Sequence, residues 1–353
     1  MTTVHQFHPV LAPGDAMGNH VLALSRRARE WGHESYMYAV EAKPGFAAEV
    51  LPYRRLFRAV KPDDLLVLHF SMGHEIFDQL VKIEARKVLV YHNITPPRFF
   101  VGINPHSSVH AQMGLRQLQT IAPRIDLAVG VSEFNRLDLE RAGYRNTARV
   151  PILIDWPAYD LAPDPDVLRH WETRPTVLLF VGRISPHKRQ DELIRLLAYY
   201  RRCVDPEAEL VLVGGHRDQP QYYERLGALA EQLGVADAVT FTGSVSLAEL
   251  VAYYTVASCF VSLSEHEGFA VPLLEAMRFG RPIVAVDAAA VGETLGGAGI
   301  LLPRGDVAEA AEASALLVER PDLREAYEAK GRDRLRDFAG EVVGRQTREA
   351  LAL

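Results

Sequence analysis

Residues 259–277 read CFVSLSEHEGFAVPLLEAM, a stretch that combines an apolar strand, a tight connection and the first turns of a helix. Its first four residues suit a buried strand, and Pro272 suits the start of a helix, where its missing N–H has no intrahelical partner. The connection over residues 268–271 would then direct backbone N–H groups and the positive end of the helix dipole toward an anion. The stretch therefore predicts an α/β fold with an anion site at a strand's carboxyl end.

Two glutamates flank this connection. Glu267 precedes the turn, where a sugar attached to the anion would lie, and Glu275 lies one turn into the helix, within reach of a ribose hydroxyl pair. Two solvated glutamates on an ordinary connection are the alternative interpretation. The Gly and Pro between them favour a binding site.

The strand–helix unit recurs along the whole chain. Apolar β-rich runs fall at residues 4–7, 35–40, 65–70, 87–91, 127–131, 176–181, 210–213, 239–241, 259–262, 283–286 and 300–302. Amphipathic helices are expected between them, at residues 18–31, 189–200, 221–233, 247–254, 272–279 and 306–318. This alternation predicts parallel sheets covered by helices on both faces.

A break near the middle divides the chain of 353 residues, which is too long for one ordinary core. Residues 152–175 carry four prolines and no sustained period, which suits a linker. We expect doubly wound, Rossmann-like domains over residues 1–155 and 176–337, a linker over 156–175, and a final helix at about 341–353 packing back on the first domain. A single eight-fold barrel would not need the break. Ligands bind beyond the carboxyl ends of such strands, so a cleft between two facing domains is the expected site.

A second loop is basic. Residues 178–190 read LLFVGRISPHKRQ, in which a strand runs into Gly182 and presents Arg183 and Lys188 just before a helix. Arg can hold a diphosphate as a fork and Lys as a point charge. Basic loops are common, but this one belongs to the same predicted sheet as the two glutamates, which favours a diphosphate site.

Two further signals lie in the first domain. In PGDAMGNHV, residues 13–21, Gly14 and Gly18 allow tight turning and close approach to a phosphate or sugar, with a plain turn as an equal alternative. His92 follows the strand at 87–91 and could hydrogen-bond a sugar hydroxyl. A packed structural histidine is the commoner explanation for such a residue.

These four stretches together resemble the retaining GT-B glycosyltransferases of family 4, over nearly the whole chain. The glutamates at 267 and 275 are similar to the family's glutamate pair, and VGRISPHK is similar to its phosphate-binding motif. The stretches at residues 241–245, 276–282 and 290–302 follow in the family's order. The resemblance implies a GT-B fold and a glycosyltransferase activity.

The resemblance also implies residue roles. The diphosphate falls to Arg183 and Lys188, the ribose to Glu275 and the transferred sugar to Glu267. The implied catalytic residues are Glu267, His92, Arg183 and Lys188. The implied donor-binding residues are Gly14, Gly18, Arg183, Lys188, Val245, Glu267, Gly268, Phe269, Ala270, Val271 and Glu275. Fixed cations and helix ends neutralise the leaving diphosphate in this family, so neither a cofactor nor a metal is expected.

The chain departs from the family's pattern at two places in the first domain. Asp15 and Ala16 stand where adjacent glycines are usual, and Asn93 follows His92 where the family often has Asp. We assign Asp15, His92 and Asn93 to acceptor binding.

The expected function is that of a retaining hexosyltransferase. It would move a mannose- or glucose-like sugar from a UDP-, GDP- or similar nucleotide sugar to a saccharide or lipid-linked acceptor, in cell-surface glycan or glycoconjugate synthesis. One alternative is a catalytically silent relative that binds nucleotide sugars. The other is a nicotinamide oxidoreductase, which should show GxGxxG with an acidic residue about 20 positions on, a pattern the sequence lacks.

The composition narrows the setting. Only two cysteines are present and no apolar run reaches the ~18 residues that cross a bilayer, so we expect a cytoplasmic protein. Residues 1–155 hold 18 Lys/Arg against 15 Asp/Glu and the rest 21 against 30, which fits either peripheral contact with the inner face of a membrane or ordinary scatter. No nucleic-acid partner is expected. Among the 13 histidines, His106 and His110 have i, i+4 spacing, but no third ligand is evident, so no metal site is expected.

Overall fold

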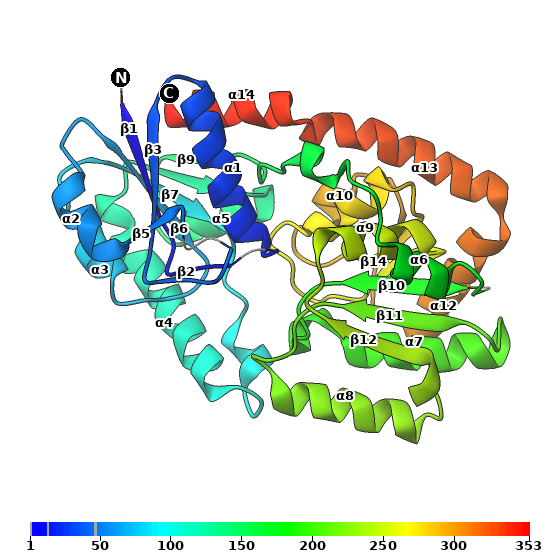
Figure 1. Ribbon diagram of the computed structural model, residues 1–353. Coiled ribbons are helices and arrows are strands. Elements are labelled where there is room, and N and C mark those ends of the chain that lie inside the picture. Colours follow the sequence, from blue (N-terminus) through cyan, green and yellow to red (C-terminus); the bar gives the residue numbers. More distant parts are fainter. Residues whose placement is uncertain (1, 13, 46–47, 175) are drawn as a thin grey trace. The chain divides into compact units, whose positions relative to one another are not determined.

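The computed structural model describes residues 2–12, 14–45, 48–174 and 176–353 (Figure 1). The chain divides into two compact units, each built on its own sheet. Unit 1 comprises Met1–Val101, Pro105–Trp156 and Phe338–Leu353, and unit 2 comprises Gly102–Asn104 and Pro157–Asp337. Unit 2 is therefore nearly continuous in sequence, whereas unit 1 is completed by the last residues of the chain. Pro13, part of the glycine-containing stretch discussed above, lies outside the described residues.

Unit 1 contains a seven-stranded parallel sheet in the order β5-β3-β1-β6-β7-β8-β9. Its strands are β1 (Thr3–Phe7), β3 (Glu34–Ala39), β5 (Val50–Pro52), β6 (Leu65–Phe70), β7 (Arg86–Tyr91), β8 (Leu127–Gly130) and β9 (Thr147–Arg149). Every residue of β6 is buried, as expected for a central strand covered on both faces. A separate two-stranded pair joins β2 (Val10–Leu11) to β4 (Glu41–Ala42).

Helices connect these parallel strands. They are α1 (Ala16–Glu30), α2 (Leu56–Ala59), α3 (Phe77–Leu80), α4 (Pro105–Ile121), α5 (Glu133–Arg141) and, from the end of the chain, α14 (Gly340–Leu351). In α14, Val343 and Leu351 are buried, and the Leu351 carbonyl accepts a hydrogen bond from Arg86 Nη1 at 2.6 Å. Trp156 Nε1 likewise donates to the Phe338 carbonyl at 2.9 Å. The C-terminal segment is thus an integral part of unit 1.

Unit 2 contains a six-stranded parallel sheet in the order β12-β11-β10-β13-β14-β15. Its strands are β10 (Val177–Val181), β11 (Glu209–Val213), β12 (Val239–Gly243), β13 (Cys259–Ser262), β14 (Ile283–Val286) and β15 (Ile300–Leu302). Its helices are α6 (Pro165–Trp171), α7 (Gln190–Cys203), α8 (Pro220–Gln232), α9 (Leu247–Val256), α10 (Val271–Arg278), α11 (Val291–Leu295), α12 (Val307–Glu319) and α13 (Pro321–Leu335). The sequence order reverses once, between the adjacent strands β10 and β13, and this switch point places the loops that follow the two strands next to each other.

The segment expected to be a linker, residues 156–175, is partly helical, which corrects the prediction. Asp164 caps α6 by accepting from the backbone N–H groups of Asp166 and Val167. Trp171, at the end of α6, is buried and packs against Tyr253 of α9 at a centroid distance of 6.5 Å. Pro165 therefore starts a helix of unit 2, so this part of the segment is not an unstructured connection.

Candidate functional site

The turn that precedes α10 has the geometry expected from its sequence. Ala270 adopts a left-handed conformation with φ of 66°, and Pro272 lies in the first turn of the helix. Two contacts from the following strand–helix connection hold the turn: Thr294 Oγ1 donates to the Phe269 carbonyl at 2.5 Å, and Ala290 N–H donates to the Glu267 carbonyl at 3.1 Å. The N-terminal end of α10, a natural anion-binding position, is therefore fixed before any ligand arrives.

Glu267 forms an ion pair with Lys188. The Lys188 ammonium lies 2.6 Å from each oxygen of the Glu267 carboxylate, and the two side chains are only 19% and 12% exposed. The sequence predicted Glu267 as a sugar contact and Lys188 as a phosphate contact, and the structure places the two groups in direct contact. The two opposite charges therefore compensate each other in a largely buried location.

Lys188 is positioned by two loops that approach closely. It ends a short 3₁₀ turn, Pro186–Lys188, after β10. Gly214, directly after β11, has φ of 146°, and a Cβ there would lie 2.1 Å from the Gly182 carbonyl oxygen. Only glycine fits this contact, which allows the loops after β10 and β11 to lie against each other.

Polar side chains brace the Lys188 loop from within. Gln190 Nε2 donates to the Arg183 carbonyl at 3.0 Å, while the Gln190 amide oxygen accepts from Ser185 N–H at 3.3 Å. His187 is buried and lies 3.0 Å from Ser185 Oγ. Burial, and then the nearby Lys188 and Arg183 charges, hold the pKa of His187 well below its usual value, so it is neutral near pH 7.

Arg183 lies apart from the Lys188–Glu267 pair. Its side chain is 69% exposed, and its guanidinium is 4.0 Å from the Asp218 carboxylate, which is also exposed. No contact between Arg183 and Glu267 occurs among the ion pairs of the described residues. The structure thus brings together one of the two predicted phosphate cations and the glutamate, and leaves the other in solvent.

Glu275 is buried between two tyrosines. Its carboxylate oxygens accept one hydrogen bond each, from Tyr159 at 2.5 Å and from Tyr254 at 2.7 Å. Burial raises the pKa of Glu275, and the two hydroxyl donors oppose that rise. No local sequence pattern indicates either tyrosine as a partner of this carboxylate, because they lie 116 and 21 residues away in the chain.

The remaining predicted donor residue of unit 2 is Val245. It lies between β12 and α9, directly before Ser246, and is partly buried. Ser246 and Glu249 form a reciprocal capping box, which fixes the start of α9 and the backbone around Val245.

The first-domain glycines have distinct backbone roles. Gly14 has φ of 74°, a conformation that favours glycine, and Asp15 is the N-cap residue of α1 without a side-chain capping bond. Gly18 lies inside α1, where a Cβ would come 2.5 Å from the Ala12 carbonyl oxygen. Gly18 is therefore required by the close approach of the preceding loop to the helix, whatever else it contacts.

The side chain of Asn93 hydrogen-bonds to another side chain of unit 1. It is buried, has φ of 81°, and its amide donates to Asn135 Oδ1 at 2.7 Å. Asn135 in turn donates to the Tyr91 carbonyl at 3.2 Å. This network gives Asn93 a structural role at the end of β7, since Asn tolerates the left-handed region.

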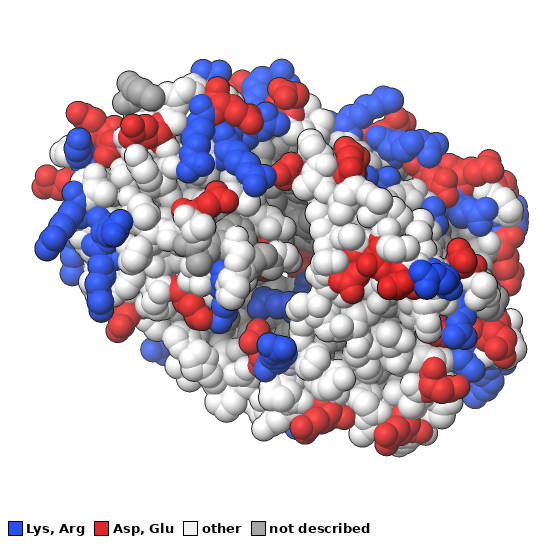
Figure 2. All heavy atoms as spheres, in the orientation of Figure 1, with Lys and Arg blue, Asp and Glu red and all other residues white. Residues whose placement is uncertain are grey.

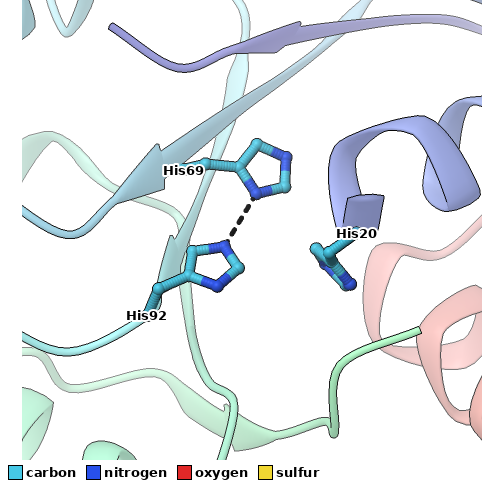
Figure 3. A group of neighbouring side chains, drawn as sticks. All are labelled: His20, His69 and His92. Carbon is cyan, nitrogen blue, oxygen red and sulfur yellow. Dashed lines mark hydrogen bonds between the residues drawn. The ribbon is translucent and has the colours of Figure 1, made fainter. Parts of the chain in front are cut away.

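His92 belongs to a cluster that the sequence did not reveal. His20 of α1, His69 of β6 and His92 offer nitrogen atoms that all lie within 4.8 Å of one another (Figure 3). His69 Nδ1 and His92 Nε2 are 3.0 Å apart. Burial, followed by the neighbouring histidines, holds the pKa of His69 and of His92 well below the usual value, and burial alone lowers that of His20 to about 4.

A hollow of about 560 Å³ lies along α4, lined by Ser108, Gln112, Arg116 and Thr120 among others. None of the predicted site residues lines it. His106 and His110, one turn apart on the same helix, have ring centroids 4.2 Å apart, and His110 Nδ1 is 3.1 Å from the Gly73 carbonyl oxygen.

On the face shown in Figure 2, acidic and basic side chains are interspersed, and the basic ones do not form one continuous patch. In the part of the chain that the structure describes, no helix combines the length and apolarity needed to cross a bilayer.

Residues 169–334 match the glycosyl transferases group 1 family. Over 129 residues the chain is 40% identical to the GDP-mannose-dependent alpha-(1-6)-phosphatidylinositol monomannoside mannosyltransferase of Mycobacterium tuberculosis, a match covering 35% of this chain and 32% of that protein. Over 113 residues it is 38% identical to the D-inositol 3-phosphate glycosyltransferase of Acidothermus cellulolyticus, covering 31% and 25%. These matches span about a third or less of each relative's length.

Solved structures extend the likeness to the whole fold. The Anabaena protein HepE, solved with UDP and glucose, superposes with a TM-score of 0.79 at 19% identity over 100% of both chains. Sucrose-phosphate synthase of Thermosynechococcus elongatus superposes with a TM-score of 0.78 at 18% identity, covering 99% of this chain and 98% of the other. The predicted α/β fold of the GT-B type is confirmed. The chain thus has the GT-B fold, and its residues 169–334 are similar to the group 1 glycosyl transferases.

Proposed function

We propose that the protein is a retaining hexosyltransferase, which transfers a sugar from a nucleoside-diphosphate sugar to an acceptor hydroxyl. The observation that carries the proposal is the Lys188–Glu267 pair, with its 2.6 Å contacts, four residues before the first residue of α10. A cation, a carboxylate and a helix N-terminus in the loops after the adjacent strands β10 and β13 suit a phosphate linked to a sugar.

Donor binding would change the partners of this pair. The departing diphosphate attracts the Lys188 ammonium, and Glu267 is then available to accept hydrogen bonds from hydroxyls of the transferred sugar. Charge grows on the phosphate as the glycosidic bond breaks, and the ammonium, together with the N–H groups that open α10, stabilises that charge. Arg183, exposed in the free protein, would reach the phosphate only by a side-chain rearrangement.

Glu275 suits the ribose. It is buried, and each of its oxygens already accepts one hydroxyl donor, so the pocket is adapted to hydroxyl groups. A ribose hydroxyl would replace the Tyr159 hydroxyl or share the same oxygen, since each carboxylate oxygen has two lone pairs.

Retention is proposed to proceed on one face of the sugar. The bond from the anomeric carbon to the phosphate oxygen breaks, the acceptor oxygen bonds to that carbon, and the acceptor's proton passes to the leaving phosphate. This route needs no separate protein base. Fixed cations would serve where other transferases use a divalent ion, so turnover without added metal is part of the proposal.

The mycobacterial relative is named for GDP-mannose, which makes GDP-mannose the first donor to test and UDP-glucose the second. The acceptor is proposed to be a saccharide or a lipid-linked saccharide, bound through unit 1, with synthesis of cell-surface glycans as the setting. Cytoplasmic location and contact with the inner face of a membrane belong to the same proposal.

A thermal-shift panel with UDP-, GDP-, ADP- and dTDP-sugars tests donor choice, because a ligand of the native state raises the apparent stability. The best donor is then incubated with simple mannosides and glucosides, and the anomeric configuration of the product is read by NMR. Binding without turnover for every acceptor would favour the alternative, a silent nucleotide-sugar-binding relative. A product of inverted configuration would refute retention.

A further inference from the structure

A buried ring nitrogen without a partner lies directly after β7. His92 Nδ1 is buried and makes no hydrogen bond with any described residue, whereas His92 Nε2 is 3.0 Å from His69 Nδ1. A buried polar atom left in this state is unfavourable, and in native proteins it usually marks a place where a ligand or water binds. The question is whether this nitrogen donates or accepts.

Sheet register explains why three polar side chains reach this place. Gln6 of β1 pairs with Val67 of β6, two residues before His69, so Gln6 and His69 lie on the same face. In the same way His69 pairs with Val90 of β7, two residues before His92. The three side chains therefore form a diagonal line across three adjacent parallel strands.

The hydrogen bonds along this line fix the position of each proton. The Gln6 amide oxygen lies 3.0 Å from His69 Nε2 and can only accept, so His69 carries its proton on Nε2. His69 Nδ1 then accepts, and His92 must donate to it from Nε2. The Gln6 amide nitrogen points the other way, toward Ser35 Oγ at 3.5 Å, which in turn accepts from Ser25 Oγ at 3.0 Å.

We propose that Gln6 and His69 form a relay that holds His92 in its Nε2–H form, so that His92 Nδ1 accepts a hydrogen bond from a hydroxyl of a bound saccharide. This inference rests on the proposed function and deepens it, since it assigns a positioning role to Gln6 and His69. A neutral acceptor at this point favours substrates that present a hydroxyl there. It disfavours oxidised sugars that present a carboxylate, because two acceptors would then face each other.

The same cluster is unsuited to a metal ion. His20 Nδ1 accepts the Leu153 N–H at 2.9 Å, which places the proton of His20 on Nε2 and leaves neither nitrogen with a free lone pair. His20 instead packs edge-on against the other two rings, at centroid distances of 5.5 Å from His69 and 5.3 Å from His92 (Figure 3). Metal binding would require breaking the contact with Leu153.

The decisive experiment reads the proton positions directly. In the full chain labelled with ¹⁵N-histidine, long-range ¹H–¹⁵N correlation spectra should show His92 with an unprotonated Nδ1 and a protonated Nε2. Spectra showing the opposite form for His92 in the wild type overturn the proposal. This readout needs no activity, so it stands or falls separately from the proposed function, which fails if no donor supports transfer.

Two variants of Gln6 connect the relay to substrate use. Gln6→Glu keeps an acceptor for His69 and should keep the His92 form and most of kcat/KM. Gln6→Met has a similar length but no acceptor, and should mix the two forms of His92 and lower kcat/KM on the order of tenfold, while binding of the free nucleoside diphosphate is unchanged. In Gln6→Met, the ratio of kcat/KM for hexose donors and acceptors to kcat/KM for the corresponding hexuronic acids should also fall.

Gln117→Met is the matched control. Gln117 is another buried glutamine of unit 1, and its amide bonds to the backbone of His74 at 3.1 and 3.0 Å, outside the relay. It should lose stability without changing the His92 spectrum. If Gln6→Met leaves the spectrum of His92 unchanged, or if Zn²⁺ binds stoichiometrically and shifts all three histidines, the relay is refuted.

Discussion

The two units carry different side chains at the carboxyl ends of their parallel strands. Those of unit 1 are polar and uncharged, whereas the loops that follow the strands of unit 2 carry charged groups. In unit 1, Gln6, His69 and His92 form a line of hydrogen bonds, and burial keeps the histidines neutral. In unit 2, Lys188 and Glu267 form a largely buried ion pair, and Glu275 is held by two tyrosine hydroxyls. The same sheet architecture thus offers a neutral hydrogen-bonding edge suited to sugar hydroxyls and an ionic edge suited to a diphosphate.

Removing the cation of the ionic edge should have the largest effect. Lys188→Ala should lower turnover on the order of 10²–10³-fold, because the role proposed for the ammonium is to stabilise charge that develops only as the leaving group departs. Lys188→Arg should restore part of it at most, since a planar fork replaces a compact charge. Steady-state kinetics with the best donor measure both.

Arg183→Ala separates the two predicted phosphate cations. Because Arg183 is exposed, we expect its loss to cost less turnover than the loss of Lys188. Lys330→Ala on α13 serves as a control for removal of a positive charge. If Lys188→Ala keeps near-normal turnover and only its KM for the donor rises, Lys188 merely holds the substrate.

Lowering the pH should change the stability of the two units in opposite directions. Histidine titrates near 6.5 when unfolded, and the pKa of His20 is lowered by burial to about 4, so the unfolded state binds more protons in between. Stability from this residue is complete above about pH 6.5 and falls by about 3 kcal/mol as the pH drops to about 4. His69 and His92 add to the same trend.

Glu275 in unit 2 behaves in the other direction, because its raised pKa reflects a cost of burying the charged form that is relieved on protonation. Hydrogen exchange at pH 7, 6 and 5 should therefore show β6 and β7 opening before β13. His20→Asn, whose amide oxygen can still accept from Leu153 N–H, should flatten the trend in unit 1. Equal loosening of both sheets in the wild type would contradict this assignment.

Within the ionic edge, the two glutamates should separate by experiment. Glu275→Ala should weaken binding of the free nucleoside diphosphate by about tenfold, because its proposed partner is the ribose. Glu267→Ala should leave that binding nearly intact and lower turnover instead. Isothermal titration calorimetry with both variants checks this, and identical binding behaviour would disprove the division of roles.

Removal of divalent metal should have the smallest effect. With fixed cations proposed for the diphosphate, turnover in excess chelator should stay within about twofold of the untreated value. Loss of activity in chelator that magnesium or manganese restores would assign the neutralising charge to a metal ion.

Local sequence signals located the ionic edge well. The Gly–Pro connection and the VGRISPHK loop each identify their own strand end, so Lys188, Glu267 and the start of α10 could be predicted. The strands β6, β13, β14 and β15 coincide with the predicted ranges because they are short apolar runs between clear turn residues.

The line of neutral side chains in unit 1 could not be predicted from local sequence patterns. His69 lies inside an apolar strand and His20 inside a helix, and only the register of β1, β6 and β7 brings them to His92. Neither α4 nor α13 was expected. Polar and charged residues interrupt the apolar period of both, and burial is limited to a few positions such as Gly114 and Gly331, so packing rather than pattern determines these helices.

The discontinuity of unit 1 has a consequence for synthesis of the chain. A ribosome releases residues 1–156 first, yet the sheet of unit 1 lacks α14 and its contact with Arg86 until Phe338–Leu353 emerge. Unit 2, encoded almost without interruption between these parts, can close first. A nascent unit 1 therefore stays partly uncovered until Phe338–Leu353 have been synthesised, which departs from the usual N-terminal-first order of domain folding.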